Sequence, residues 1–130
     1  EIISRRPLLI ADVAHNPQKM TAFVSSLKRI IPVQRRRVVC LCSIKYTKDL
    51  YATLKPLLPI VDELILTTFP KSASLTVLRR TAKQLQPQLT IKAISHTLSA
   101  YRYFRSRLNH PDVGIITGSL YLIGKLQPVL

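Results

Sequence analysis

The chain has 130 residues, of which 47% are hydrophobic, and its mean hydropathy is +0.17; these values exclude a disordered chain and predict one domain with a substantial core. No apolar run approaches the roughly 18 residues of a membrane span, and the first residues do not form a secretory signal, so we expect a soluble, cytoplasmic domain. The 20 Lys and Arg outnumber the six Asp and Glu, giving a net charge of +14, and this excess predicts an anionic partner or a neighbouring acidic surface.

Apolar runs that suit strands alternate with segments of helical periodicity along the whole chain. The first strand is expected at Leu8–Asp12 and the first helix at Pro17–Ile31, with Asn16 as its N-cap. The later elements are expected as a strand at Val38–Cys42, a helix from Tyr46 to about Leu58, a strand at Glu63–Thr68, a helix at Leu75–Gln86, a strand at Thr90–Ile94, a helix at Thr97–Leu108, a strand at Val113–Thr117 and a short helix over Leu120–Gly124. This alternation predicts a three-layer, Rossmann-like α/β fold with a mostly parallel sheet, whose functional edge is formed by the carboxyl ends of the strands.

Polar residues follow both the first and the last predicted strand. Asp12 and His15 come after the first; Asp12 can cap the turn and His15 can pack under the helix, or both can belong to a functional site. After the last strand, Gly118 permits a tight turn and a close approach of the backbone. Ser119 can cap the next helix, whose free N–H groups favour an anion such as a carboxylate or phosphate. Two polar turns at one edge of the sheet favour the functional interpretation.

A third polar segment follows the second predicted strand, at residues 43–49. Its lysines, Lys48 among them, can supply cations to an anionic ligand, and Asp49 can supply an acid that orders them. A structural explanation is also adequate, with Thr47 as the N-cap and Asp49 in the first helical turn.

The sequence lacks the motifs of several other kinds of functional site. The three glycines all lie late in the chain, and no phosphate-binding loop, nucleophile elbow or metal-ligand spacing is present. Cys40 and Cys42 are expected as buried apolar side chains on one strand face. His96 and His110 are expected as turn or cap residues, and the basic cluster Arg35–Arg37 as a solvated helix end. A self-sufficient catalyst is therefore not expected.

The order of the polar motifs resembles the C-terminal domain of the Mur ligase superfamily, and within it the folylpolyglutamate synthase/dihydrofolate synthase family. That family's first strand carries Asp-Gly-Ala-His-Asn-Pro, which stands here as Asp12–Pro17 with Val13 in place of the glycine. Its Lys-Asp pair before a helix matches Lys48–Asp49, with Thr47 in place of an acidic residue. Its closing Thr-Gly-Ser-Leu-Tyr segment matches Thr117–Gly124, so the resemblance covers nearly the whole chain.

The resemblance implies the C-terminal, glutamate-binding domain of an ATP-dependent ligase that adds L-glutamate to folates through an acyl phosphate. ATP and Mg²⁺ would be bound mainly by an N-terminal ATP-binding domain of the same ligase, which this 1–130 domain is expected to lack and without which it would be inactive. The implied partners are that domain, L-glutamate and folate or dihydropteroate; neither a membrane nor nucleic acid is expected. The resemblance makes His15 and Asp12 the expected catalytic residues, and the expected substrate-binding residues are Ser119, Asn16, Lys48, Asp49 and Tyr121. No metal ligand is expected in this domain.

Two other functions stay open. The high charge also suits a stand-alone basic α/β module that binds nucleic acid or another polyanion, although the aromatic residues are not interleaved with the basic cluster and no nucleic-acid motif is present. A Mur-type ligase for a different amino acid is the third candidate, and the closing Gly-Ser-Leu-Tyr segment counts against it. Salt-dependent binding to a polyanion would separate the basic module from the ligase domain.

Overall fold

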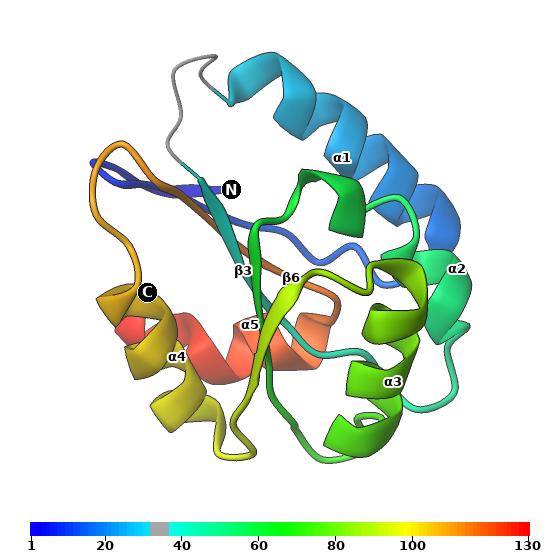
Figure 1. Ribbon diagram of the computed structural model, residues 1–130. Helices are drawn as coiled ribbons and strands as arrows, with labels where there is room; N and C mark the ends of the chain where they lie inside the picture. The colour runs from blue at the N-terminus through cyan, green and yellow to red at the C-terminus, as the bar shows by residue number, and fades with distance from the viewer. Residues whose placement is uncertain (32–36) are drawn as a thin grey trace.

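The computed structural model describes residues 1–31 and 37–130, in which one six-stranded sheet lies between two layers of helices (Figure 1). The strand order is β1-β2-β6-β3-β4-β5, and every neighbouring pair is parallel except β1 with β2. The strands are β1 (Ile2–Arg5), β2 (Leu8–Ala11), β3 (Val38–Cys42), β4 (Glu63–Leu66), β5 (Thr90–Ala93) and β6 (Val113–Thr117). The predicted three-layer α/β fold with a mostly parallel sheet is confirmed.

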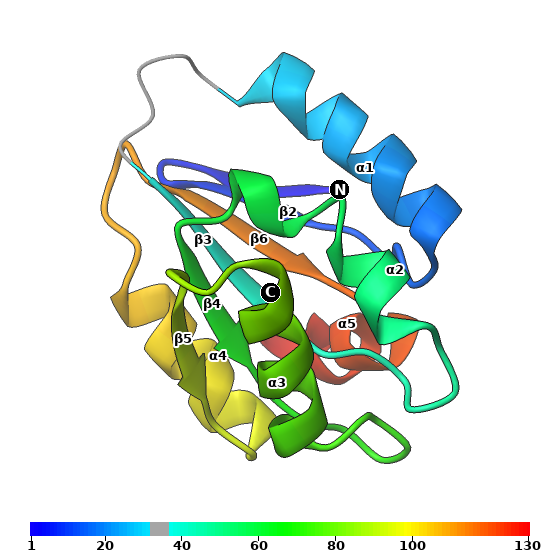
Figure 2. The same cartoon turned by 45° about the vertical axis from the view of Figure 1, so that its right-hand side comes forward.

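The helices divide between the two faces of the sheet, as Figures 1 and 2 show from two directions. One face is covered by α1 (Pro17–Ile30), α2 (Leu50–Leu54) and α3 (Leu75–Leu85), and the other by α4 (Thr97–Ser106) and α5 (Leu120–Leu126). Two short 3₁₀ helices complete the described chain, η1 (Leu58–Ile60) and η2 (Gln127–Val129). None of the helices in the described ranges has the length and apolar character that crossing a membrane requires.

The central strands β3 and β6 are buried along their whole length, because helices cover both of their faces. Cys40 and Cys42 lie on the same face of β3 as buried free thiols, which confirms the prediction. The hydrogen bond that the Cys40 thiol donates to Cys42, together with burial, raises the pKa of Cys40. Both cysteines therefore act as small apolar side chains of the core.

The structure corrects the sequence-based elements at two places. Strand β1 was not predicted; it pairs antiparallel with β2 at one edge of the sheet. The helix expected from Tyr46 to about Leu58 is wrong, because only Leu50–Leu54 is α-helical. The loop before it is held by a bridge between Lys45 and Ser72, and Pro56 cannot continue a helix, since it has no N–H and its ring clashes with the preceding turn.

Ion pairs between buried carboxylates and partly exposed arginines close the amino edge of the sheet. Glu63 at the start of β4 is 4% exposed, and its carboxylate lies 3.1 Å from Arg37 Nη1 and 3.0 Å from Arg107 Nε. Arg37 also lies 3.4 Å from Asp112, which is fully buried, and donates a hydrogen bond to the carbonyl of Arg107. The hydrogen bond to Glu63 raises the pKa of Arg107. Of the predicted basic cluster, Arg37 therefore has a structural role, and Arg35 and Arg36 lie outside the described residues.

Candidate functional site

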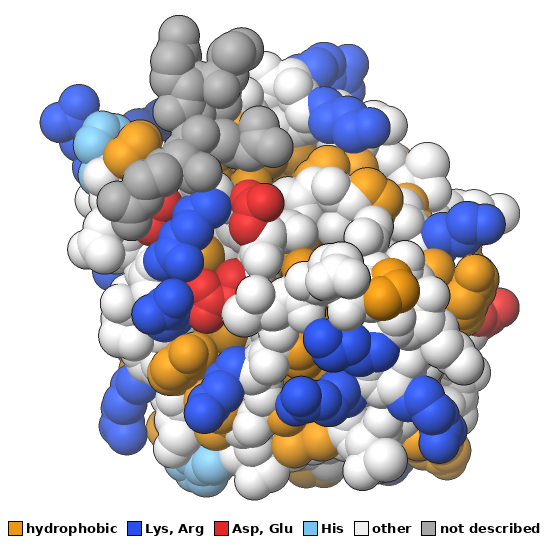
Figure 3. Space-filling view, in the orientation of Figure 1, with side chains coloured by type: hydrophobic (Ala, Val, Ile, Leu, Met, Phe, Trp, Pro, Cys, Tyr) orange, Lys and Arg blue, Asp and Glu red, His pale blue; other side chains and the backbone are white. Residues whose placement is uncertain are grey.

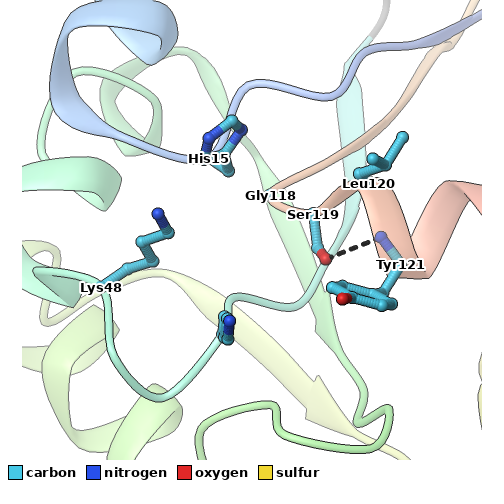
Figure 4. A pocket seen from close by; sticks show the side chains of 7 residues that line it. His15, Lys48, Gly118, Ser119, Leu120 and Tyr121 are labelled. Atoms are coloured by element: carbon cyan, nitrogen blue, oxygen red, sulfur yellow. Dashed lines mark hydrogen bonds between the residues drawn. The ribbon is translucent and has the colours of Figure 1, made fainter.

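The carboxyl ends of three adjacent strands, β2, β6 and β3, converge on one pocket. Since these strands are parallel neighbours, the turns that follow them meet at the same edge of the sheet. The pocket has a volume of about 180 Å³ and opens to solvent, and Figure 4 shows it from close by. Its lining residues are His15, Lys45, Lys48, Gly118, Ser119, Leu120 and Tyr121.

His15 reaches the pocket from the turn between β2 and α1, which is fixed by its own side chains. Asp12 Oδ1 accepts a hydrogen bond of 2.8 Å from the backbone N–H of Ala14. Asn16 caps α1, because its Oδ1 accepts a 2.8 Å hydrogen bond from the N–H of Lys19. His15 Nδ1 lies 2.9 Å from the carbonyl oxygen of Val13, and since a carbonyl only accepts, Nδ1 carries the proton. The other ring nitrogen, Nε2, is then left to meet a ligand.

The turn after β6 brings Gly118 and Ser119 against the end of β3. Gly118 has a φ of +109°, and a Cβ built there would overlap the backbone oxygen of Ser43 and lie 2.9 Å from Cys42 Sγ. Only glycine fits both the backbone conformation and this close approach. Ser119 is 3% exposed, and its Oγ accepts a 3.0 Å hydrogen bond from the N–H of Tyr121 (Figure 4). That bond uses Oγ as an acceptor and leaves the Ser119 hydroxyl hydrogen to be donated.

Two lysines supply the charge of the pocket from the loop between β3 and α2. Lys45 and Lys48 are half-buried, and within the described part of the chain neither has a carboxylate within 4.0 Å. None of the pocket-lining residues is an Asp or Glu. In Figure 4 the side chain of Lys48 extends toward the side of the pocket where His15 lies. The pocket therefore has a positive character that suits a small anion such as a carboxylate.

Aromatic and apolar side chains form the outer rim of the pocket. The ring of Tyr121 stacks on that of Phe69, with centroids 5.8 Å apart and planes inclined by 16°. Tyr121 is 59% exposed and Leu120 is 65% exposed, which is high for large side chains of this kind. This rim offers exposed apolar surface at the mouth of the pocket.

Of the site residues expected from the sequence, the structure brings His15, Lys48, Ser119 and Tyr121 together around this pocket. Asp12, Asn16 and Asp49 do not line it, because their side chains bond to nearby backbone N–H groups. The prediction that Thr47 caps the helix after β3 is wrong: Asp49 is the N-cap of α2, and its Oδ1 accepts a 3.0 Å hydrogen bond from the N–H of Ala52.

The structure also places Lys45 and Val13. Lys45 lines the pocket but was not predicted as a site residue, although it lies in the same polar segment as Lys48, directly after the second predicted strand. Val13 stands where the resembling family has glycine, yet its φ is not positive; among described non-glycine residues only Lys71 has a positive φ. His96 caps α4 and His110 lies in a turn, as expected.

The pocket is too small to enclose a whole nucleotide. Its volume of about 180 Å³ is below the roughly 300–1,000 Å³ of sites that enclose a drug-sized ligand. In residues 1–31 and 37–130, no group of three or more His, Cys, Asp or Glu side chains is arranged to hold a metal ion. The donors present, two ammonium groups and a hydroxyl, suit one or two anionic groups of a small substrate, and Nε2 of His15 can accept a hydrogen bond.

Comparisons with known proteins point in one direction. The family model described as "Mur ligase, glutamate ligase domain" matches residues 1–120, while no match was found among curated proteins. Escherichia coli FolC in complex with DHPP and ADP is 23% identical, with a TM-score of 0.87 over 99% of this chain and 30% of that one.

Two other solved structures are of bifunctional folylpolyglutamate synthase/dihydrofolate synthase. The enzyme from Yersinia pestis complexed with AMPPNP and Mn ion is 27% identical, with a TM-score of 0.82. A structure with Mn, AMPPNP and L-glutamate bound is also 27% identical, with a TM-score of 0.85. Each similarity covers 99% of this chain and 30% of the other, so the chain spans about 30% of the length of these enzymes.

Proposed function

The chain belongs to the Mur ligase glutamate ligase domain family, as the order of its motifs predicted, and we propose that it is the glutamate-binding domain of an ATP-dependent ligase that extends folates. The observation that carries this proposal is the pocket at the carboxyl edge, where Lys45, Lys48, His15 and Ser119 converge and no carboxylate competes with a ligand. A related bifunctional synthase has been crystallised with Mn, AMPPNP and L-glutamate, which supports glutamate as the ligand.

Each side chain then has a defined task toward L-glutamate. The ammonium groups of Lys45 and Lys48 attract the two carboxylates of the amino acid, and the Ser119 hydroxyl donates a hydrogen bond to one of them. His15 presents Nε2 toward the ligand, because Nδ1 is engaged by the carbonyl of Val13. Tyr121 at the rim contacts the substrate or the domain that covers it.

Asp12, Asn16 and Asp49 act in this proposal as positioning residues. Asp12 and Asn16 hold the two ends of the turn that presents His15, through their bonds to Ala14 and Lys19. Asp49 fixes the start of α2 directly after Lys48. The three side chains therefore serve the site through the backbone, without touching the substrate.

Activation of the folate carboxylate belongs to a second domain in this proposal. ATP and Mg²⁺, bound mainly by an ATP-binding domain, supply the phosphoryl group that turns the carboxylate into an acyl phosphate. This chain holds L-glutamate so that its amine faces that acyl group, and it covers the reacting groups from water, which would otherwise hydrolyse the acyl phosphate. Alone it is expected to be inactive.

The test supplies an ATP-binding domain and measures activity. The chain is joined to the ATP-binding domain of the Yersinia pestis synthase, and ATP- and glutamate-dependent extension of a folate is measured. We expect activity in the joined protein and a loss of at least about 100-fold, a typical contribution of a positioned polar group, in His15→Ala and in Ser119→Ala. The matched controls His110→Ala and Ser25→Ala change exposed residues away from the pocket and should retain activity. A folded joined protein without activity, or full activity in both site variants, would contradict the proposal.

A further inference from the structure

One turn of the chain contacts two walls of the glutamate pocket. The 69–73 turn lies between β4 and α3, and none of its residues lines the pocket. One wall carries Lys45, from the loop between β3 and α2, and the other carries Ser119 and Tyr121, from the start of α5. Figure 4 shows Tyr121 beside Ser119, on the side of the pocket away from Lys48. The contacts of this turn decide how the two walls are placed relative to each other.

Phe69, the first residue of the turn, supports the α5 wall. Its ring stacks on that of Tyr121, with centroids 5.8 Å apart. Phe69 is 6% exposed and belongs to the apolar layer that also contains Leu122 and Leu126 of α5. Among the described residues no second ring packs on Tyr121, and the N–H of Tyr121 donates to Ser119 Oγ. The place of Tyr121, and of the Ser119 hydroxyl bonded to it, therefore depends on Phe69.

Ser72, near the other end of the turn, supports the Lys45 wall. The two residues pair in an isolated antiparallel bridge. Beside that bridge, the N–H of Ala73 donates a 2.8 Å hydrogen bond to the carbonyl of Ile44. The backbone at Lys45 is therefore fixed by a segment that follows a different strand, β4. Core packing accounts for the burial of Phe69, but it does not require the same turn to pair with Lys45.

Hydrogen bonds within the turn join its two ends. The N–H of Phe69 donates to Ser72 Oγ at 3.2 Å, and the N–H of Ser72 donates to the carbonyl of Phe69 at 2.9 Å. Ser72 Oγ donates to the carbonyl of Ala73 at 3.0 Å. Lys71 takes the left-handed conformation, with a φ of +70°, and its carbonyl accepts a 3.0 Å hydrogen bond from the N–H of Tyr46. A displacement of Phe69 is therefore transmitted to the other end of the turn.

Positive charge alone does not make this pocket selective. The chain has a net charge of +14, and Lys and Arg side chains are spread over the face of the molecule that Figure 3 shows. L-Glutamate and L-aspartate carry the same charges and differ by one methylene group. A pocket that selects between them must therefore hold its polar groups at a fixed spacing.

From these contacts we propose that Phe69 and Ser72 are positioning residues, which set the spacing between Lys45 and the start of α5. This spacing selects L-glutamate over the shorter L-aspartate. The inference rests on the proposed function and deepens it, because it assigns the length of the amino-acid substrate to residues outside the pocket. With the walls fixed, the two carboxylates of the shorter amino acid cannot both reach their partners, and with the walls loosened the pocket loses this preference.

The test compares L-glutamate with L-aspartate as substrates of the chain joined to the ATP-binding domain of the Yersinia pestis synthase. Phe69→Leu removes the stacked ring and keeps an apolar side chain. We expect it to raise the KM for L-glutamate about fivefold, with kcat changed less than about twofold. The ratio of kcat/KM for L-glutamate to that for L-aspartate should fall at least about threefold. Because this ratio does not depend on the amount of folded enzyme, a loss of stability alone leaves it unchanged.

Phe104→Leu is the matched control, because Phe104 is a buried ring of the same apolar layer. It packs near the amino end of β6, where a Cβ added to Gly114 would lie 2.9 Å from Phe104 Cζ. This substitution should destabilise the domain. It should change neither the KM nor the ratio by more than about twofold.

Ser72→Ala tests the Lys45 wall separately, and it replaces Phe69→Leu should that variant unfold. Loss of the hydroxyl opens the turn, so the KM for L-glutamate should rise about threefold and the ratio should fall. Ser74→Ala is its control, since it removes the N-cap of α3, whose Oγ accepts a 3.2 Å hydrogen bond from the N–H of Val77. This control should lower stability through loss of the cap and leave the ratio unchanged.

In an active parent protein, an unchanged ratio in both Phe69→Leu and Ser72→Ala, or an equal fall in Phe104→Leu, would overturn the proposal. An inactive parent protein would contradict the proposed ligase function itself, and with it the inference that rests on it. In the ¹⁵N-labelled 130-residue chain, which needs no second domain, Phe69→Leu should also shift the amide resonance of Lys45, and Phe104→Leu should leave it in place. An unmoved Lys45 resonance in Phe69→Leu would overturn the proposal whether or not the joined protein is active.

Discussion

The two edges of the sheet use the same kinds of charged residue in opposite ways. At the amino edge, Glu63 and Asp112 are buried and bonded to Arg37 and Arg107. At the carboxyl edge, the cations of the pocket face solvent with no carboxylate beside them. Paired charges fix one arrangement of the chain, whereas unpaired charges keep their capacity to bind an anion. In this domain, charged side chains therefore indicate a binding site only where no oppositely charged side chain is paired with them.

Exposure explains why the carboxyl edge tolerates unpaired charge. A fully buried, unpaired ammonium would be strongly destabilising, but Lys45 and Lys48 are only half-buried and stay hydrated. Glu63, by contrast, is 4% exposed and needs its two arginines. We therefore expect substitutions at the amino edge to change stability, and substitutions of the pocket cations to change binding.

The largest expected effect comes from a substitution in the backbone turn after β6, at the carboxyl edge. Gly118→Ala should lower the free energy of unfolding by about 3 kcal/mol or more, because the new Cβ overlaps the backbone oxygen of Ser43 and the φ of +109° strains any other residue. Denaturant unfolding measures this change. Gly124→Ala is the matched control: no atom lies within 4 Å of the added Cβ, so alanine in α5 should be neutral or stabilise by up to about 1 kcal/mol. Equal behaviour of the two variants would contradict this account of Gly118.

The next effect tests the amino edge. Glu63→Gln should lower the free energy of unfolding by about 2 kcal/mol, since it leaves Arg37 and Arg107 without their shared carboxylate; their partial exposure keeps the loss below that of a fully buried pair. Arg107→Gln should cost less than Glu63→Gln, because the Arg107 side chain is 42% exposed and solvent screens its ion pair. Thermal or urea unfolding gives both values. A Glu63 variant as stable as the parent chain would show that the network does not hold the amino edge.

A smaller effect distinguishes a positioning residue from one that touches substrate. Asn16→Ala should lower the free energy of unfolding by about 1 kcal/mol through loss of the α1 cap, and Asn16→Asp should restore most of it. Since Asn16 does not line the pocket, the KM for glutamate of Asn16→Asp in the two-domain protein should stay within about twofold of the parent value. A large rise in this KM with stability unchanged would instead make Asn16 a substrate ligand.

The sequence predicted most of the fold because the buried strands and amphipathic helices carry strong periodic signals. It missed β1, whose four residues are partly exposed and gain their structure by pairing with β2. The sequence-based prediction also made the helix after β3 too long at both ends, because the helical spacing of the leucines continues beyond Leu50–Leu54. Before α2 the chain is held instead by the bridge between Lys45 and Ser72, and after α2 the ring of Pro56 prevents a helix.

The site was predictable in its location and less so in its details. Parallel strands bring the turns of His15 and Ser119 together, so their proximity followed from the fold class. The sequence could not separate side chains that reach the pocket from those that bond locally. Asp12 bonds to an N–H two residues later, which no spacing rule distinguishes from a ligand contact. Lys45 enters the pocket because of a bridge to a loop far along the chain.

The most direct test of the contrast between the edges is the KM for L-glutamate of Lys48→Gln in the two-domain protein. Loss of an unpaired cation that contacts a carboxylate should raise KM about tenfold, or about 1.4 kcal/mol. Both kcat and the free energy of unfolding should change little, by less than about threefold and about 0.5 kcal/mol. The control Lys55→Gln, an exposed lysine after α2, should leave KM unchanged. An unchanged KM in Lys48→Gln with lowered stability would contradict the account, because Lys48 would then be a structural charge like those of the amino edge.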